Sequence, residues 1–164
     1  MKTKLTNQAL KEHREKIILG ESIEQYYLNK TEELNLKSFS RIKAYLQDFL
    51  PENNHLITRD IIFAHLSFEL LANSLAEGKS FTVISGLNPS SPLHLGHKVL
   101  FDLLLYLQKL GADVFIPITN DESYLDGKVP SLAASRKIAY EEIIPSIIAF
   151  GFDPKKTKIF VMSD

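Results

Sequence analysis

The sequence predicts an α/β protein built on a parallel sheet, the first half of a doubly wound fold, with an α-helical extension in front of it. Short apolar and β-branched segments occur at 81–85, 113–119 and 158–162. Two longer segments of helical periodicity separate them, and the connections are short. Strands that alternate with helices in this way favour parallel pairing through right-handed crossovers.

Composition allows a sizeable core and excludes several classes of protein. The chain has 164 residues, of which 45% are hydrophobic, and a net charge of -1. Without a basic surface, contact with RNA must be local or depend on other regions. There is no cysteine, so disulfides and thiolate metal sites are excluded. The polar N-terminus and the broken apolar runs predict a cytoplasmic protein with no membrane partner.

The first 54 residues differ in character from the rest. They are rich in Lys and Glu, with helical spacing of apolar residues at 5–20 and 38–50. A turn-prone cluster, PENN, follows at 51–54. We therefore expect a helical extension over 1–54 and the main domain over 55–164.

The first half of the main domain should form a helix and a strand. In 65–79, Leu66, Leu70, Leu71 and Leu75 fall on one helical face, and Gly78 is suited to the position after a helix end. Residues 81–85, FTVIS, are typical of a buried strand.

The second half should form two helices and two strands. Apolar spacing predicts a helix over 95–110 that ends at Gly111. Residues 113–119 form the next strand, in which Pro117 lacks a donor, so pairing should fail near the carboxyl end. Ser131 can cap a helix that runs to residue 150 with a kink at Pro145, and 158–162 is the last strand.

The stretch PSSPLHLGH, residues 89–97, lies where the first strand gives way to the long helix. Ligands of parallel sheets bind at this end of the strands, where helices begin with free N–H groups. Glycine-rich phosphate loops are absent. His94 and His97 can instead donate hydrogen bonds to a phosphate, while Gly96 lets a flat base approach the backbone.

This pattern favours a nucleoside triphosphate that is attacked at its α-phosphate. Two histidines at this spacing can also be a surface or capping feature. A metal site is weakly supported, because no third ligand accompanies the two histidines.

The motif resembles the HIGH signature of class I aminoacyl-tRNA synthetases, and its surroundings resemble the tryptophanyl enzymes of archaeal and eukaryotic type. Supporting stretches are RDIIFAHLSFELL at 59–71, TNDESYL at 119–125 and AFGFDPKKTKIF at 149–160. The resemblance runs from about Asn54 to the last residue. It implies the first half of a HUP-type, Rossmann-like catalytic domain.

The resemblance implies that ATP activates tryptophan to its adenylate and that the amino acid then passes to tRNA. His94 and His97 would be the catalytic residues at the ATP phosphates, Gly96 would lie against adenine, and Mg²⁺ would accompany the nucleotide. Pro89, Ser90 and Ser91 would shape the phosphate loop. The tRNA would bind through regions outside this chain, and the full-length protein would be a homodimer.

The family's amino-acid pocket aligns with four positions of this chain, which are Ile84, Gly86, Pro117 and Glu122. The family has tyrosine, glutamine and glutamate where this chain has Ile84, Pro117 and Glu122, so only the glutamate is kept. Buried polar partners decide specificity between close analogues. Tyrosine therefore stays open as an alternative substrate.

A class I enzyme also needs a KMSKS-like loop in the second half of its fold, and this sequence contains none. We therefore expect the chain to be a fragment that is inactive alone. Two alternatives stay open: a stand-alone nucleotide-binding or nucleotidyltransferase-like protein, and a non-catalytic relative of the synthetases.

Overall fold

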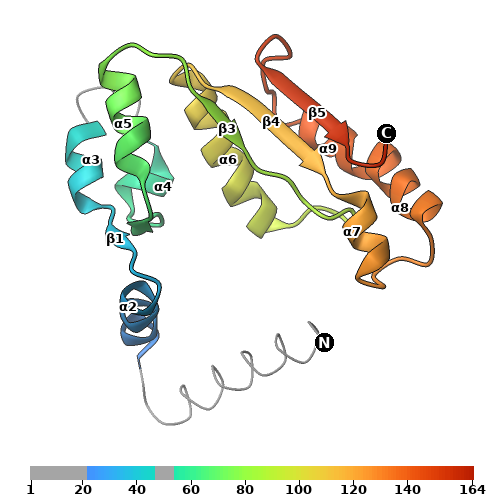
Figure 1. Ribbon diagram of the computed structural model, residues 1–164, viewed down its shortest axis with the longest axis horizontal. Helices are drawn as coiled ribbons and strands as arrows, with labels where there is room; N and C mark the ends of the chain where they lie inside the picture. Colours follow the sequence, from blue (N-terminus) through green and yellow to red (C-terminus); the bar gives the residue numbers. More distant parts are fainter. Residues whose placement is uncertain (1–21, 47–53) are drawn as a thin grey trace.

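The computed structural model describes residues 22–46 and 54–164 (Figure 1). The helix expected at 5–20 and the end of the one expected at 38–50 lie outside these residues. The elements follow in this order: α2 (Ile23–Glu33), β1 (Lys37–Ser38), α3 (Ser40–Leu46), α4 (His55–Thr58), β2 (Ala64–His65), α5 (Phe68–Ala76), β3 (Thr82–Ile84), α6 (Leu95–Lys109), β4 (Asp113–Ile118), α7 (Asn120–Leu125), α8 (Leu132–Ile138), the π-helical segment η1 (Ala139–Ile143), α9 (Ile144–Ile148) and β5 (Thr157–Val161).

Strands β3, β4 and β5 form a parallel sheet with β4 in the centre, which confirms the expected fold class. The register places Ile84 opposite Phe115 and Pro117 opposite Phe160. Helix α6 connects β3 to β4, and the helices α7 to α9 connect β4 to β5. All three strands therefore end at the same edge of the sheet.

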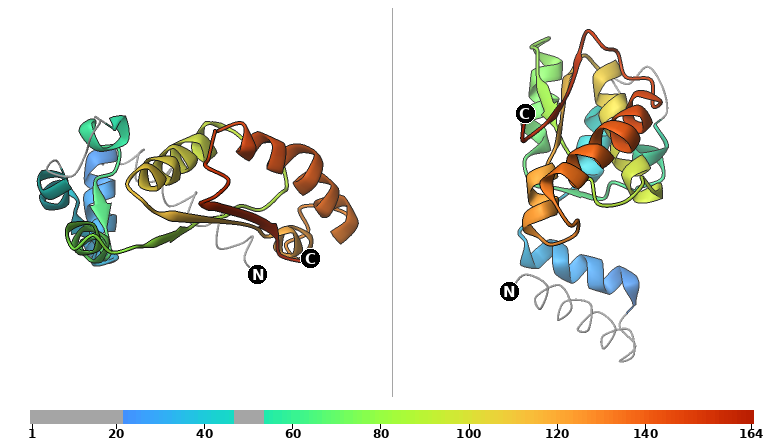
Figure 2. Two further views of the ribbon diagram at one scale, coloured as in Figure 1. Left: turned by 90° about the horizontal axis from the view of Figure 1, so that it is seen from above. Right: turned by 90° about the vertical axis from the view of Figure 1, so that its right-hand side faces the viewer.

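Helices cover one face of this sheet. Val114, Ile116 and Ile118 alternate along β4 and are fully buried. They pack against Phe101 and Leu104 of α6 and against the α8–α9 segment. Figure 2 shows these helices on one side of the sheet. Within the described residues no helix covers the opposite face.

The expectation of a buried strand at 81–85 was wrong. Strand β3 is an edge strand within the described residues, and Ile84, on the uncovered face, is 68% exposed. Its β-branched composition reflects strand propensity rather than burial on both faces.

Pro117 is tolerated in the central strand. Pairing with β5 continues past it to Ile118, so the expected failure near the carboxyl end was wrong on that side. Its carbonyl accepts the Leu87 N–H at 3.2 Å, which also keeps the β3 side connected. The N–H and C=O of one residue in a parallel strand face the same neighbouring strand. The N–H that Pro117 lacks would therefore face β3, and only one hydrogen bond on that side is lost.

The long helix before β5 forms as expected, with one irregularity. Ser131 Oγ accepts the Ala134 N–H at 3.1 Å, and Gly151 ends the segment at a φ of 83°. Before Pro145, the five residues Ala139–Ile143 adopt a π-helical turn. Proline lacks an N–H and crowds the preceding turn, and a wider turn relieves that crowding.

Helices α3 to α5 and the β1–β2 ladder form a second cluster beside α6. Phe39, Ile42 and Ile57 are buried in it together with Tyr106 and Leu107 of α6. Strands β1 and β2 pair across residue 54, where we expected a boundary. That domain division stays a prediction.

Helix α5 buries a different stripe from the one that we expected. Phe68, Leu71 and Leu75 pack on the second cluster, whereas Leu70 is 67% exposed. Leu66 lies before the helix and is also exposed. Residues three and four apart share a helical face, and Leu70 lies off the face that Phe68 and Leu71 define.

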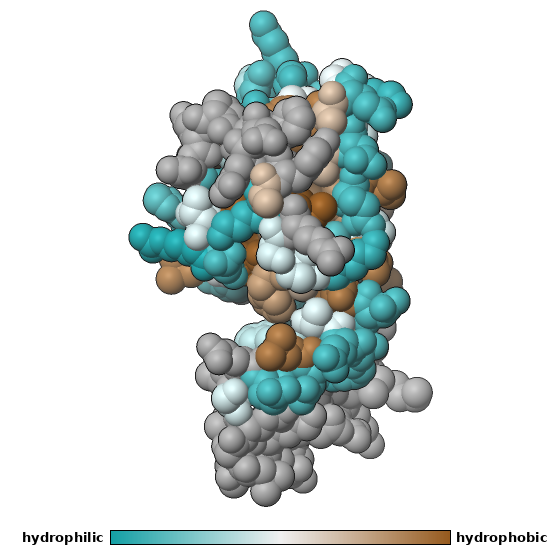
Figure 3. Space-filling model, turned by 90° about the vertical axis from the view of Figure 1, so that its left-hand side faces the viewer, coloured by the Kyte–Doolittle hydropathy of each residue, from teal (hydrophilic) through white to brown (hydrophobic). Residues whose placement is uncertain are grey.

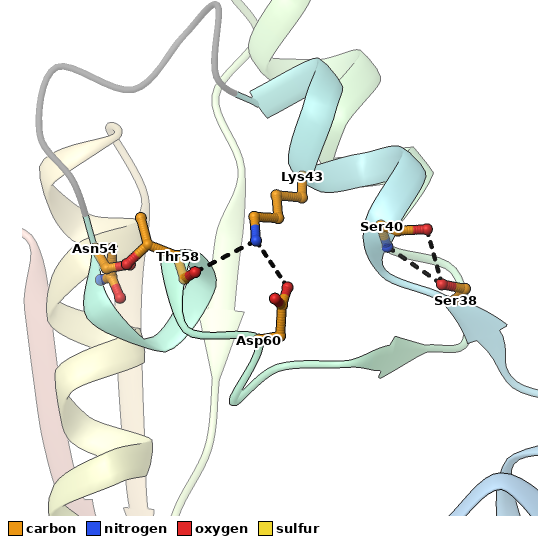
Figure 4. Close-up of polar contacts among 6 residues, drawn as sticks. All are labelled: Ser38, Ser40, Lys43, Asn54, Thr58 and Asp60. Carbon is orange, nitrogen blue, oxygen red and sulfur yellow. Dashed lines mark hydrogen bonds and ion pairs between the residues drawn. The ribbon is translucent and has the colours of Figure 1, made fainter.

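A polar link fastens α3 to the turn after α4. Lys43 Nζ contacts Asp60 Oδ1 at 2.8 Å and the Thr58 carbonyl at 3.4 Å (Figure 4). Beside it, the Ser38 and Ser40 hydroxyls lie 2.9 Å apart at the start of α3. The contacts of Lys43 join segments on either side of residue 54.

Surface hydropathy is mixed. The side shown in Figure 3 carries hydrophilic residues with small hydrophobic patches among them. In the described part of the chain, no helix has the length and apolar character needed to cross a membrane.

Candidate functional site

The loop after β3 brings the sequence motif to the carboxyl edge of the sheet. Gly86 begins this loop against Pro117: a Cβ at Gly86 would lie 2.8 Å from Pro117 Cγ and closer still to the Pro117 carbonyl oxygen. Only glycine allows this approach. Leu87 then re-forms the ladder opposite Ile118, and Pro89 is fully buried.

His94 and His97 cap the N-terminus of α6. The backbone N–H of Gly96 donates to His94 Nδ1 at 3.1 Å, and the His94 N–H donates to His97 Nδ1 at 3.2 Å. The ring centroids are 3.9 Å apart. Each ring therefore helps to satisfy the free N–H groups of the first helical turn.

These contacts determine which ring nitrogen carries the proton. An Nδ1 that accepts a backbone N–H cannot itself be protonated, so each neutral imidazole carries its hydrogen on Nε2. Burial, and then the neighbouring His94, lowers the pKa of His97. His97 thus stays neutral at physiological pH, and the pair offers two Nε2–H donors at the positive end of a 15-residue helix.

The two serines of the loop are more accessible than Pro89. Ser90 is half-buried and Ser91 is exposed, and the Ser90 N–H donates to the Asn88 carbonyl at 2.9 Å. In the described chain their hydroxyls make no hydrogen bond, so both can meet a ligand. Gly96 lies under the His94 ring, where a Cβ would come within 3.0 Å of His94 Cε1.

The expected amino-acid positions lie at the same edge. Ile84 and Pro117 point to the uncovered face, because their neighbours Val114, Ile116 and Ile118 point to the helices. Glu122 lies in the first turn of α7 and is exposed. The structure thus places the apolar surface of Ile84 and Pro117 and the Glu122 carboxylate at the same edge of the sheet as the loop that leads to His94 and His97.

Sequence reasoning missed Asn88. Its Oδ1 accepts hydrogen bonds from Thr119 Oγ1 at 3.2 Å and Ser123 Oγ at 3.1 Å. Its Nδ2 lies 3.5 Å from Glu122 Oε2. The sequence offered one signal for Asn88: it follows Gly86 and Leu87 directly after the first strand, and a polar segment, TNDES, follows the second strand at 119–123.

Asn120 was also missed. It is completely buried, and it exchanges two hydrogen bonds with Ser163: its Nδ2 donates to Ser163 Oγ at 2.8 Å, and its Oδ1 accepts the Ser163 N–H at 3.2 Å. These bonds hold the start of α7 against the end of β5. They fix the carboxyl edge on which the site is built.

A side-chain metal centre is not formed by the residues that the structure describes. Nowhere among them do three or more His, Asp or Glu side chains come together in a way that could hold an ion. At the carboxyl edge, the Asp164 carboxylate forms an ion pair with Arg136 at 2.7 Å.

Comparison with known proteins gives consistent results. Residues 76–164 match the family model of class I tRNA synthetases (W and Y). The chain is 36% identical over 114 residues to the tryptophan–tRNA ligase of Methanocaldococcus jannaschii, a match that covers 70% of this chain and 30% of the relative. The chain spans about a third of the length of the curated relatives that it matches.

Solved structures show the same similarity. Tryptophanyl-tRNA synthetase from Aeropyrum pernix aligns with a TM-score of 0.76 at 32% identity, covering 87% of this chain and 38% of that one. The synthetase from Encephalitozoon cuniculi, solved with bound tryptophan, aligns with a TM-score of 0.75 at 31% identity over 82% of this chain and 40% of its own.

Proposed function

The chain belongs to the class I tRNA synthetases of the tryptophan and tyrosine type, and we propose that it forms the nucleotide-binding part of a tryptophan–tRNA ligase. Enzymes of this class use ATP. In the proposed reaction, tryptophan and ATP give tryptophanyl-adenylate and pyrophosphate, and the tryptophanyl group then passes to the end of tRNA. The relatives named above support tryptophan as the amino acid.

The observation that carries this proposal is the pair of Nε2–H donors at the start of α6. A tryptophan carboxylate oxygen attacks the α-phosphorus, and the bond from that phosphorus to the oxygen of the leaving pyrophosphate breaks. Negative charge grows on the phosphate oxygens as this happens. His94 and His97 would donate to those oxygens without giving up a proton, and such donors lower the barrier by stabilising the transition state.

The remaining loop residues would position the nucleotide. The free hydroxyls of Ser90 and Ser91 would contact phosphate, and the buried ring of Pro89 would keep their backbone in place. Gly96 would lie against adenine, and its missing Cβ also leaves room for the His94 ring above it. Positioning of this kind makes the reaction effectively intramolecular.

Magnesium fits this arrangement as part of the nucleotide. Because the described residues form no cluster of three or more ligands, the ion would be held by the phosphates of the nucleotide and by water. When bound, it would neutralise charge on the phosphates. The chain's own contribution stays with the histidines and the loop.

In the amino-acid site, Glu122 would accept a hydrogen bond from the substrate side chain. Ile84 and Pro117 would contact the ring of the substrate. Gly86, which has no side chain, would keep the loop after β3 close to Pro117. An indole has the flat apolar body and the single N–H donor that these groups fit. A phenol has the same elements, so tyrosine is the competing substrate in any test.

Three further properties are proposed for the complete protein: binding of tRNA through regions beyond this chain, formation of a homodimer, and a cytoplasmic location. They follow from the family and stay predictions for this chain.

The test is amino-acid-dependent exchange of labelled pyrophosphate into ATP by the protein in its cellular form. We expect exchange with tryptophan, and a fall of about 100-fold or more in the rate for His94→Ala and for His97→Ala, the range for a lost transition-state donor. His55→Ala, on α4, is the matched control and should keep full activity.

Exchange with tyrosine instead of tryptophan would overturn the choice of substrate. Histidine variants within three-fold of the unaltered protein would overturn the role of the pair. ATP binding without exchange of either amino acid would favour a stand-alone nucleotide-binding protein.

A further inference from the structure

Asn88 lies in the loop after β3, and its carboxamide contacts three residues at the start of α7, which are Thr119, Glu122 and Ser123. We infer that Asn88 is a positioning residue for amino-acid specificity, which holds the Glu122 carboxylate toward the substrate side chain. This inference rests on the proposed role of Glu122 in the amino-acid site.

Two hydroxyl groups hold the Asn88 amide. Ser123 Oγ, which is completely buried, donates to Asn88 Oδ1 at 3.1 Å, and Thr119 Oγ1 lies 3.2 Å from the same oxygen. The Thr119 hydroxyl hydrogen is shared with the Leu87 carbonyl at 3.3 Å. A flipped amide would place its oxygen against the Glu122 carboxylate, and the repulsion between them selects the orientation with Nδ2 toward Glu122, whereas the two hydroxyls can either donate or accept.

In this orientation the NH₂ group of Asn88 faces Glu122. Nδ2 lies 3.5 Å from Oε2, which is the long limit of a hydrogen bond. The contact orients the carboxylate without using all its acceptor capacity, because a carboxylate has about four lone-pair sites. Glu122 is otherwise exposed on a short helix and would be free to turn into solvent.

The substrate class follows from the groups that lie with Glu122 at the carboxyl edge of the sheet. Ile84 and Pro117 offer an apolar surface on the uncovered face of the sheet, and Glu122 offers an acceptor. A side chain with a flat apolar body and one N–H or O–H donor pairs with both. An analogue without the donor, phenylalanine, leaves the carboxylate unpaired, and sites built for a hydrogen bond reject such analogues strongly.

Asn88→Asp separates positioning from structural support. Aspartate has the same shape and still accepts from Thr119 and Ser123, but it cannot donate to Glu122 and places a like charge beside it. We expect KM for tryptophan to rise about tenfold with kcat within two-fold, and the preference for tryptophan over phenylalanine to fall by a similar factor, since uniform binding is lost. Asn73→Asp, on the exposed surface of α5, is the control with the same change of charge.

A second measurement keeps this inference separate from the proposed function. Crystal structures of the unaltered protein and of Asn88→Asp should show the Glu122 carboxylate turned away from residue 88 in the variant and unchanged backbone at Thr119 and Ser123. A Glu122 that keeps its place in Asn88→Asp overturns the inference, as does an unchanged preference for tryptophan. If the unaltered protein activates neither tryptophan nor tyrosine, the proposed function fails. The position of Glu122 in the two crystal structures still decides whether Asn88 positions it.

Discussion

The close approach of Gly86 to β4 allows a sharp test of how the site is built. In Gly86→Ala the new methyl carbon would lie 2.8 Å from Pro117 Cγ and 2.9 Å from the Pro117 carbonyl carbon. Normal carbon–carbon contacts are about 3.5–4.0 Å, and the Pro117 carbonyl oxygen would lie even closer to the new carbon than these two atoms, so the two segments must separate by roughly an ångström or more. Pro117 cannot turn away, because its ring fixes the backbone and its neighbours Ile116 and Ile118 are buried.

The expected cost can be assembled from this displacement. Overpacking in a tight interior costs about 1–3 kcal/mol. Separation also weakens the bond from the Leu87 N–H to the Pro117 carbonyl, now 3.2 Å, which adds about 1 kcal/mol. We therefore expect Gly86→Ala to lower the free energy of unfolding by roughly 2–4 kcal/mol.

Urea denaturation, followed by circular dichroism, measures this change as a shift of the midpoint at constant slope. Gly78→Ala is the matched control: its φ is 64°, but a Cβ there meets nothing within 4 Å, so it should cost only about 1 kcal/mol for the left-handed conformation. If Gly86→Ala costs no more than Gly78→Ala, the reasoning from close approach is refuted.

Three other predictions follow from individual side chains. Folding lowers the pKa of His97, so the unfolded chain, in which this pKa is near 6.5, binds a proton more readily than the folded chain. The contribution of His97 to stability is therefore present above pH 6.5 and is lost as the pH falls. Urea midpoints at pH 7.5 and 5.5 should differ less in His97→Gln than in the unaltered protein, and an equal difference would contradict the pKa shift. Asn120→Ala removes two buried hydrogen bonds and should cost about 2–3 kcal/mol, whereas Asn73→Ala on the surface should cost under about 0.5 kcal/mol, both by chemical denaturation. Burial raises the pKa of Tyr106 to about 12, and its hydroxyl has no hydrogen-bond partner in the described chain. Tyr106→Phe should therefore leave the free energy of unfolding unchanged or raise it by about 1 kcal/mol. A decrease in the free energy of unfolding of more than about 1 kcal/mol would show that the hydroxyl is hydrogen-bonded.

Much of the local structure could be predicted from the sequence. Apolar spacing identified α6 and α5, the β-branched segments identified three strands, and Ser131 and Gly151 marked the ends of the last long helix. The histidine motif was placed correctly at the start of α6. These features depend on contacts between residues a few positions apart, and a sequence displays such contacts directly.

Which faces are covered was decided only by the tertiary structure. Ile84 lies on an uncovered face although its segment has the composition of a buried strand, and Leu70 is exposed although it repeats with helical spacing. Pro117 is accepted in the central strand because its carbonyl still pairs with Leu87. Periodicity shows that a face is apolar, but the packing of other elements determines whether that face is buried.

The chemistry of the site divides along the same line. The residue types at 94 and 97 come from the sequence, but the backbone N–H groups that keep their hydrogens on Nε2 act only once the helix start has formed. The contact of Asn88 with Glu122 joins residues 34 positions apart, and that of Asn120 with Ser163 joins residues 43 apart. Sequence pattern carries no distance between such positions, because strand order and crossover packing bring them together.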